Sequence, residues 1–194
     1  MKIGSIIFTA FAFLIAMTLI TGLIYPLVMT GFGQIVFPFQ ANGSIIKEGN
    51  KIRGSRLLAQ EFTSDEFFSG RPSAGSYTTL PSGASNLSPS GKALKAAVDG
   101  RKADWSKRYG NVQPPNEMLY ASASGLDPDI SINAALAQVD RIVKARMLSD
   151  EQKLVLTGMI KNNPETLELY PAITRVSVMD INLLLEIDPR LRAK

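Results

Sequence analysis

The chain has 194 residues, of which 45% are hydrophobic, and a formal net charge of +4 at pH 7. It contains no cysteine and no histidine, which excludes thiolate and imidazole metal ligands, cysteine nucleophiles and any Ser-His-Asp triad. Its 21 basic residues are interspersed among 17 acidic ones, and no basic run carries interleaved aromatic residues. We therefore expect no metal site and no nucleic-acid partner.

The first 39 residues are predicted to form a membrane anchor. No charged residue lies between Lys2 and Lys47, and the 22 residues from Ile3 to Ile24 include twelve Leu, Ile, Phe or Val residues. On an insertion scale these favour the bilayer by about −4 to −7 kcal/mol, and as a helix the segment spans roughly 33 Å. A cleaved signal peptide is the alternative, but its apolar region should be shorter, and a second apolar piece, Leu27 to Phe39, follows without a convincing cleavage motif.

The short positive end of the anchor, formed by the amino terminus and Lys2, is predicted to stay in the cytoplasm, because long domains cross membranes largely regardless of their charge. Residues 1–39 are then an anchor helix with an apolar extension in the inner (plasma) membrane, in contact with lipid. Residues 40–194 are an extracytoplasmic, periplasmic domain. Pairs of small residues four positions apart in the helix would let a second membrane helix approach closely. These pairs are Ala12 with Ala16 and Thr18 with Gly22.

The first half of the domain is predicted to contain a hairpin, a long loop and a helix. Residues 44–58 read as a hairpin with its turn at 48–50. Residues 61–90 are rich in Ser, Gly and Pro and are expected to form an ordered loop rather than a flexible linker, because four aromatic residues can anchor them. Those residues are Phe62, Phe67, Phe68 and Tyr77. Residues 90–109 follow as a helix with one apolar face.

The second half is predicted to contain two helices and a strand. Ser131 is a suitable N-cap for a helix with a buried stripe running from Ile132 to Met147. Ser149 and Gln152 form a capping box for a second helix, which the sequence at 162–164 should end. Residues 174–188 are rich in Val, Ile and Leu and read as a strand, in one or two pieces around residue 180. The fold class is therefore α+β: one N-terminal transmembrane helix and one extramembrane α+β domain.

The sequence offers little catalytic chemistry. It has no Gly-rich phosphate-binding loop, no G-x-G-x-x-G turn and no aspartate in an Asp-Lys-Thr-Gly context. Asp127 and Asp129 lie in a context typical of a helix start, where capping is favoured over acid–base work. One enzyme pattern, S-x-x-K at Ser44 and Lys47, leaves a membrane-anchored Ser/Lys hydrolase of the outer membrane face as an alternative function. A membrane-anchored solute-binding domain is a third possibility.

Six segments of the domain, taken in order, resemble the C subunit of the bacterial Kdp potassium-transporting P-type ATPase. The segments are 54–62 (GSRLLAQEF), 67–74 (FFSGRPSA), 82–90 (SGASNLSPS), 121–128 (ASASGLDP), 138–146 (QVDRIVKAR) and 175–183 (RVSVMDINL). Each segment is weak alone, but their order and the N-terminal anchor together cover the whole chain. The family usually has Gly where Ala84 and Ala123 stand and His where Asp129 stands, so no role of that His is carried over.

The resemblance implies a non-catalytic accessory subunit of a high-affinity, ATP-driven potassium importer. Its partners would be a potassium-binding channel-like subunit and a P-type ATPase subunit, so ATP and potassium are handled by the complex and no cofactor is expected on this chain. The family is described as needed for assembly and as a catalytic chaperone that raises the ATP affinity of the ATPase subunit. Because a periplasmic domain cannot touch cytoplasmic ATP, structural coupling through the membrane helix, or a cap near the potassium entrance, is the more physical interpretation.

Polar and turn residues of the resembling segments are the candidate site. We expect them either to contact the channel-like subunit or to order the loops by internal hydrogen bonds. They are Arg71, Pro72, Ser85, Asn86, Gly125 and Asp127.

Overall fold

The computed structural model describes residues 3–162, 165–166 and 174–191. The chain divides into two compact units, Met1–Ile52 and Arg53–Lys194. The division falls inside a hairpin, whereas the predicted domain boundary lies at residues 39 and 40. That boundary, which concerns where the chain leaves the membrane, stays a prediction.

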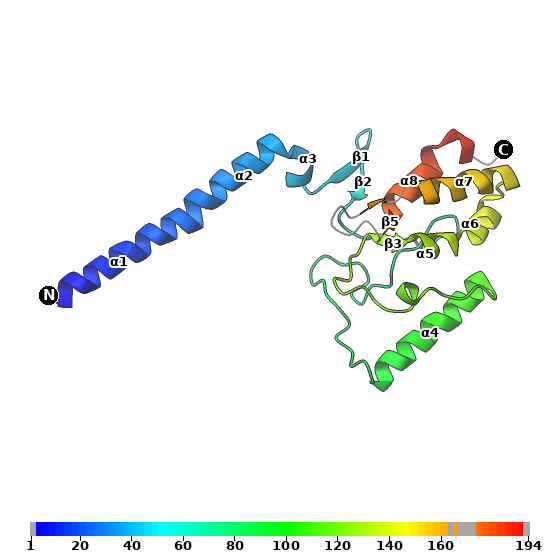
Figure 1. Ribbon diagram of the computed structural model, residues 1–194, viewed down its shortest axis with the longest axis horizontal. Helices are drawn as coiled ribbons and strands as arrows, with labels where there is room; N and C mark the ends of the chain where they lie inside the picture. The colour runs from blue at the N-terminus through cyan, green and yellow to red at the C-terminus, as the bar shows by residue number, and fades with distance from the viewer. Residues whose placement is uncertain (1–2, 163–164, 167–173, 192–194) are drawn as a thin grey trace. The chain divides into compact units, whose positions relative to one another are not determined.

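The first unit is dominated by one long apolar helix (Figure 1). It is built from α1 (Ile3–Leu19), the π-helical turn η1 (Ile20–Ile24) and α2 (Tyr25–Val36). Within the described part of the chain it is the single helix long and apolar enough, by length and composition, to cross a membrane. Its 34 residues correspond to about 51 Å, more than the roughly 30 Å of a hydrocarbon core.

Pro26 lies inside this helix without ending it. The sequence separates Ile3–Ile24 from a second apolar piece, but the structure joins them into one rod. In the π turn the Tyr25 N–H bonds to the Ile20 carbonyl, five residues back. Such a wide turn displaces the carbonyls that a proline ring would otherwise meet. Further along the rod, the Thr9 and Thr21 hydroxyls donate to backbone carbonyls four residues earlier, at 2.9 and 2.7 Å, which satisfies them without water.

A short helix, α3 (Pro38–Ala41), and a hairpin follow the long helix. The hairpin pairs β1 (Ile45–Glu48) with β2 (Lys51–Ser55). Its turn places Gly49 at φ +58°, a conformation that glycine adopts without steric cost. The hairpin and turn predicted from the sequence are confirmed.

The second unit is organised around a small antiparallel sheet in the order β3-β5-β4. The strands are β3 (Asp129–Ser131), β4 (Glu165–Thr166) and β5 (Thr174–Ser177), with Ile130 opposite Val176 in the register. Four helices accompany the sheet (Figure 1): α5 (Ile132–Leu136), α6 (Val139–Arg146), α7 (Asp150–Asn162) and α8 (Val178–Ile187). The unit also contains α4 (Lys92–Tyr109) and the 3-10 turns η2 (Asn116–Met118) and η3 (Pro189–Leu191). Its fold is α+β, as predicted.

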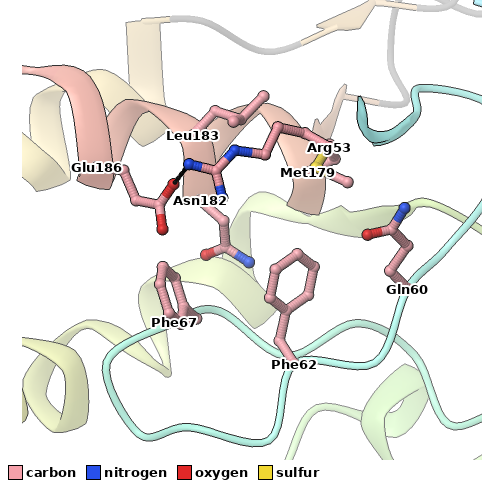
Figure 2. A pocket seen from close by; sticks show the side chains of 8 residues that line it. All are labelled: Arg53, Gln60, Phe62, Phe67, Met179, Asn182, Leu183 and Glu186. Atoms are coloured by element: carbon pink, nitrogen blue, oxygen red, sulfur yellow. Dashed lines mark ion pairs between the residues drawn. The ribbon is translucent and has the colours of Figure 1, made fainter. Parts of the chain in front are cut away.

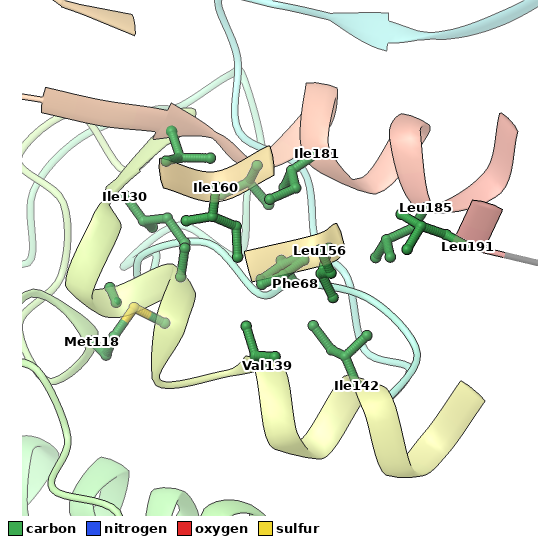
Figure 3. Close-up of a cluster of buried hydrophobic side chains, with 14 of the residues drawn as sticks. Phe68, Met118, Ile130, Val139, Ile142, Leu156, Ile160, Ile181, Leu185 and Leu191 are labelled. Carbon is green, nitrogen blue, oxygen red and sulfur yellow. The ribbon is translucent and has the colours of Figure 1, made fainter. Parts of the chain in front are cut away.

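The core of this unit lies between the sheet, α5–α8 and the loop that carries Phe68 (Figure 3). Phe68, Ile130 and Ile142 are fully buried. Because Phe68 belongs to an irregular segment, its burial ties that segment to the helices. Truncating a buried Phe to Ala costs about 3–5 kcal/mol, so the loop at 61–90 is an ordered part of the fold, as its aromatic residues indicated.

Local capping signals were predicted correctly. The Ser131 hydroxyl accepts the Ala134 N–H at 3.1 Å and so caps α5. At the start of α7, the Ser149 N–H donates to the Gln152 side chain at 2.9 Å, and the Gln152 N–H donates to the Ser149 hydroxyl at 3.3 Å. These reciprocal bonds satisfy amides that the first helical turn leaves unpaired. The helix predicted for 90–109 is also confirmed as α4.

Two predicted elements were wrong. The single helix expected from Ile132 to Met147 is interrupted between α5 and α6, and Met147 is 83% exposed in a left-handed C-cap instead of buried. The strand expected over 174–188 ends at Ser177, and helix α8 follows. The Ser177 hydroxyl accepts the Asp180 N–H at 3.2 Å, and an apolar face at helical spacing then packs into the core.

Candidate functional site

Two buried amide side chains fix the backbone of the loop at Phe68 and Ser69. Asn182, on α8, accepts the Phe68 N–H at 2.8 Å and donates to the Phe68 carbonyl at 2.9 Å. Gln138, at the break between α5 and α6, makes the same pair of bonds with Ser69 at 2.8 and 3.0 Å. A buried backbone amide must find such partners. Gln138 makes these bonds at the point where the helix predicted from Ile132 to Met147 is interrupted.

Two arginines of α6 bond in a similar way to the residues that precede Phe68. We call these two arginines, together with Asn182 and Gln138, the clamp. Arg141 donates to the Phe67 carbonyl at 2.7 Å, and Arg146 to the Glu66 carbonyl at 2.9 Å. Burial lowers the pKa of the Arg141 guanidinium. An ion pair with Asp65 at 3.2 Å acts in the opposite direction. Hydrogen bonding from Arg108 holds the pKa of the Asp65 carboxyl below its ordinary value. The loop is thus held chiefly through its backbone, by side chains from distant helices.

Arg71 and Asp127, both candidates from the sequence, form an ion pair. Arg71 Nη1 lies 2.8 Å from Asp127 Oδ2, and Arg175 on β5 approaches the same oxygen at 3.5 Å. The other oxygen of Asp127 accepts the Asp129 N–H at 3.2 Å. Asp127 therefore stabilises a turn before β3. The capping role that its sequence context suggested belongs to Ser131 instead.

Pro72 and Gly125 lie in the same cluster of loops. The Pro72 carbonyl accepts the Ser122 N–H at 2.9 Å. Gly125 has φ +72°, and a Cβ built there would lie 2.9 Å from the Gly83 carbonyl oxygen. Only glycine fits this close approach at a positive φ. The structure therefore brings four of the six candidates together, and their contacts are the internal, loop-ordering kind.

Ser85 and Asn86 do not join this cluster. Both are exposed, and Asn86 has φ +50°. Among the described residues, no hydrogen bond is found for either side chain. The contacts around Asp127 are internal, whereas Ser85 and Asn86 are exposed. A role for any of these residues in contacting a partner stays a prediction.

A small pocket borders the clamp (Figure 2). Phe62 and Phe67 come from the loop, Met179 and Leu183 from α8, and an Arg53–Glu186 ion pair of 3.3 Å lies at its side. Its volume of about 220 Å³ is below the roughly 300–1,000 Å³ of typical small-molecule sites. Among the described residues no cluster of acidic side chains could hold a metal ion. The pocket gives no support to a solute-binding domain.

Comparison with known proteins identifies the family. The model of the family "KdpC: K+-transporting ATPase, c chain" matches residues 7–187. The chain belongs to the KdpC family. It is similar to the potassium-transporting ATPase KdpC subunits of Rhodopseudomonas palustris (41% identity; 89% of this chain, 92% of the relative) and Leptospira interrogans (41%; 94% of each chain). A third similar KdpC subunit is that of Pseudomonas entomophila (42%; 91% of this chain, 92% of the relative).

The KdpC match begins inside the long helix, which carries the predicted helix-packing residues. Ala12 and Ala16 lie on α1, as does Thr18, and Gly22 lies in the π turn. All four are exposed in the first unit, and a Cβ on Gly22 would meet no atom within 4 Å. Six residues separate Ala12 from Thr18, which rotates the second pair about 120° from the first. Helix packing at these residues stays a prediction.

The alternative hydrolase pattern lacks the geometry it needs in this KdpC chain. Ser44 is 3% exposed and has φ +50°. Lys47, the would-be base, is exposed on β1, whereas a catalytic lysine requires desolvation.

The residues that the sequence did not single out are Gln138, Arg141, Arg175 and Asn182. A usable signal existed for Gln138 and Asn182, because each is a polar residue at an apolar stripe position. Arg175 carried no such signal, since its partner Asp127 is 48 residues away.

Proposed function

We propose that this KdpC chain acts as the accessory subunit of a high-affinity, ATP-driven potassium importer, through assembly and structural coupling. Family membership makes it a non-catalytic subunit of a Kdp ATPase complex. The further proposal is that its partners are a potassium-binding channel-like subunit and a P-type ATPase subunit. The observation that carries it is the match over residues 7–187, which covers most of the apolar helix and most of the second unit.

The proposed topology is single-pass, with a cytoplasmic amino terminus and residues 40–194 in the periplasm. It is supported by the charge-free segment between Lys2 and Lys47 and by Lys2 at the short end. In this topology the domain and cytoplasmic ATP are on opposite sides of the membrane. An effect on nucleotide affinity would then have to pass through the membrane helices, so structural coupling accounts for it better than nucleotide contact.

Because the chain contains no cysteine, its topology can be tested with a single introduced one. Leu154→Cys, at a position 73% exposed on α7, should react with a membrane-impermeant maleimide when only the outer face of the inner membrane is accessible. Ile3→Cys, which keeps the positive charge of Lys2, should react only after the membrane is permeabilised. The reverse pattern would overturn the proposed orientation.

Partnership is tested by pull-down of the tagged full chain from detergent-solubilised membranes. We expect recovery of a P-type ATPase subunit and a multi-span subunit. Recovery of the chain alone would contradict the proposal. Ala16→Leu, which adds bulk at a proposed helix contact, should reduce this recovery several-fold. Ala10→Leu, about 120° away on the same helix, is the matched control and should not; equal recovery from both variants would argue against that contact.

A further inference from the structure

A loop of 20 residues, Pro72 to Gly91, contains no charged residue. We call it the uncharged loop. It lies between Arg71 and Lys92 in a chain of which 20% is charged. Charged residues are depleted in the buried centres of protein–protein interfaces and abundant on free surfaces. The absence of charge therefore sets this loop apart from the rest of the unit's surface.

Internal hydrogen bonds fix the beginning of the uncharged loop. The Ser73 hydroxyl accepts the N–H groups of Gly75 and Tyr77 at 3.2 and 3.0 Å. The Tyr77 hydroxyl donates to the Arg71 carbonyl at 2.9 Å, and the Thr78 hydroxyl donates to the Gly75 carbonyl at 2.7 Å. The loop therefore starts from a set geometry and is not a flexible linker.

The loop also adopts backbone conformations that non-glycine residues rarely occupy. Ser76, Tyr77 and Asn86 have φ of +51°, +58° and +50°. Such residues persist only where the surroundings over-determine them, and they concentrate at functional sites. Further along, the Gly83 carbonyl oxygen lies so near Gly125 that a Cβ built on Gly125 would be only 2.9 Å from it.

Apolar side chains on this fixed loop point to solvent. Leu80 is 91% exposed and Leu87 is 38% exposed, and Ser85 and Asn86 between them are exposed as well. In the isolated chain, a leucine side chain that is almost fully exposed contributes no hydrophobic free energy to folding. Leucines held this way contribute free energy when a partner buries them.

We propose that the uncharged loop is a docking element whose Leu80 inserts into an uncharged, apolar hollow on a partner subunit of the same complex. This proposal rests on the proposed function, since it names the surface through which the subunit assembles. A protein is favoured over lipid as the occupant because the loop lacks the tryptophan, lysine and arginine that hold segments at a membrane interface. Its one tyrosine, Tyr77, is half-buried and directs its hydroxyl to the Arg71 carbonyl. Its exposed Ser85 and Asn86 instead offer hydrogen bonds, which a protein rim satisfies.

The test compares single cysteines in the assembled complex and in the free chain. Leu80→Cys is the probe, and Leu154→Cys, on α7, is the matched control, because both leucines are mostly exposed. We expect maleimide labelling of position 80 to slow at least tenfold in the complex, and that of position 154 to change less than about twofold. Equal rates at position 80 in the two states, or equal protection at both positions, would overturn the proposal.

Two further readouts separate the proposal from its alternatives. A photo-crosslinker at position 80 should recover a partner subunit; recovery of lipid instead would show a membrane contact and overturn the protein assignment. Leu80→Glu should reduce partner recovery several-fold while the fluorescence of Trp105, the chain's one tryptophan, stays unchanged. If the unmodified chain recovers partners but position 80 is unprotected, the docking assignment fails and the proposed function stands. If the unmodified chain recovers none, the proposed function itself fails.

Discussion

Replacing Asn182 by Leu should destabilise the second unit severely. Asn182 is 2% exposed and bonds to both polar groups of the Phe68 backbone, at 2.8 and 2.9 Å. Leucine has a similar volume but leaves a buried N–H and a buried C=O without partners. Each such group costs about 1–3 kcal/mol, so the free energy of unfolding should fall by about 2–6 kcal/mol, a large share of the roughly 5–15 kcal/mol of a typical domain.

Denaturant unfolding of the full chain in detergent, followed by Trp105 fluorescence, measures this change. Asn133→Leu, at an exposed position on α5, is the matched control and should change stability by no more than about 0.5 kcal/mol. Asn182→Asp adds a discriminating test. Its carboxylate can accept from Phe68 but repels the carbonyl, whereas its protonated form can both accept and donate. Burial raises the pKa of such a carboxyl, so the penalty should shrink as pH falls toward about 4. A loss below about 1 kcal/mol for Asn182→Leu, or no pH dependence for Asn182→Asp, would refute the reasoning.

Three other predictions use the same unfolding assay. Gly125→Ala should lower the free energy of unfolding by about 1–3 kcal/mol because residue 125 has a positive φ. Gly158→Ala, in helix α7 with open space around its Cα, should raise it by about 0.5–1 kcal/mol. A change of the same sign in both variants would contradict this. Hydrogen bonding from Arg108 lowers the pKa of Asp65. The stability that Asp65 contributes is therefore present above the unfolded-state pKa of about 3.9 and is lost as pH falls through the lower folded-state pKa. Asp65→Asn should lose less stability below about pH 4 than the unmodified chain, and parallel pH profiles would disprove this. Ser131→Ala should cost about 1 kcal/mol through loss of the N-cap, and no change would show that the cap is dispensable.

Features that depend on neighbouring residues could be read from the sequence. The caps at Ser131 and Ser149 and the turn at Gly49 each need only a few adjacent residues and a local hydrogen bond. The long apolar helix was predicted for the same reason, since its signal is composition. Its continuity through Pro26 was not predicted, because the π turn that accommodates proline leaves no mark in hydrophobic periodicity.

Features set by distant partners could not be read in this way. Residues 178–187 are rich in Leu and Ile, which suit a strand or a helix, and tertiary packing selects the helix. A local sign was available all the same: Ser177 followed three residues later by Asp180 is a helix-start pattern. The interruption at Gln138 is different. A polar residue at an apolar stripe position marks Gln138 itself, but its partner Ser69 is 69 residues away, so no local pattern predicts that the helix is interrupted there.

The candidate site shows the same division between features set by neighbouring residues and features set by distant partners. Family motifs pointed to Arg71 and Asp127, but not to the ion pair between them across 56 residues. Because Arg71 and Asp127 pair with each other and Asp127 also with Arg175, we expect these residues to affect a partner through the shape of the loops. Leu80 is bound by no such internal contact among the described residues, so its side chain is available to a partner. We therefore expect a subunit without catalytic chemistry to have two kinds of sensitive position: residues that fix the conformation of the loops, and residues that the loops expose to a partner.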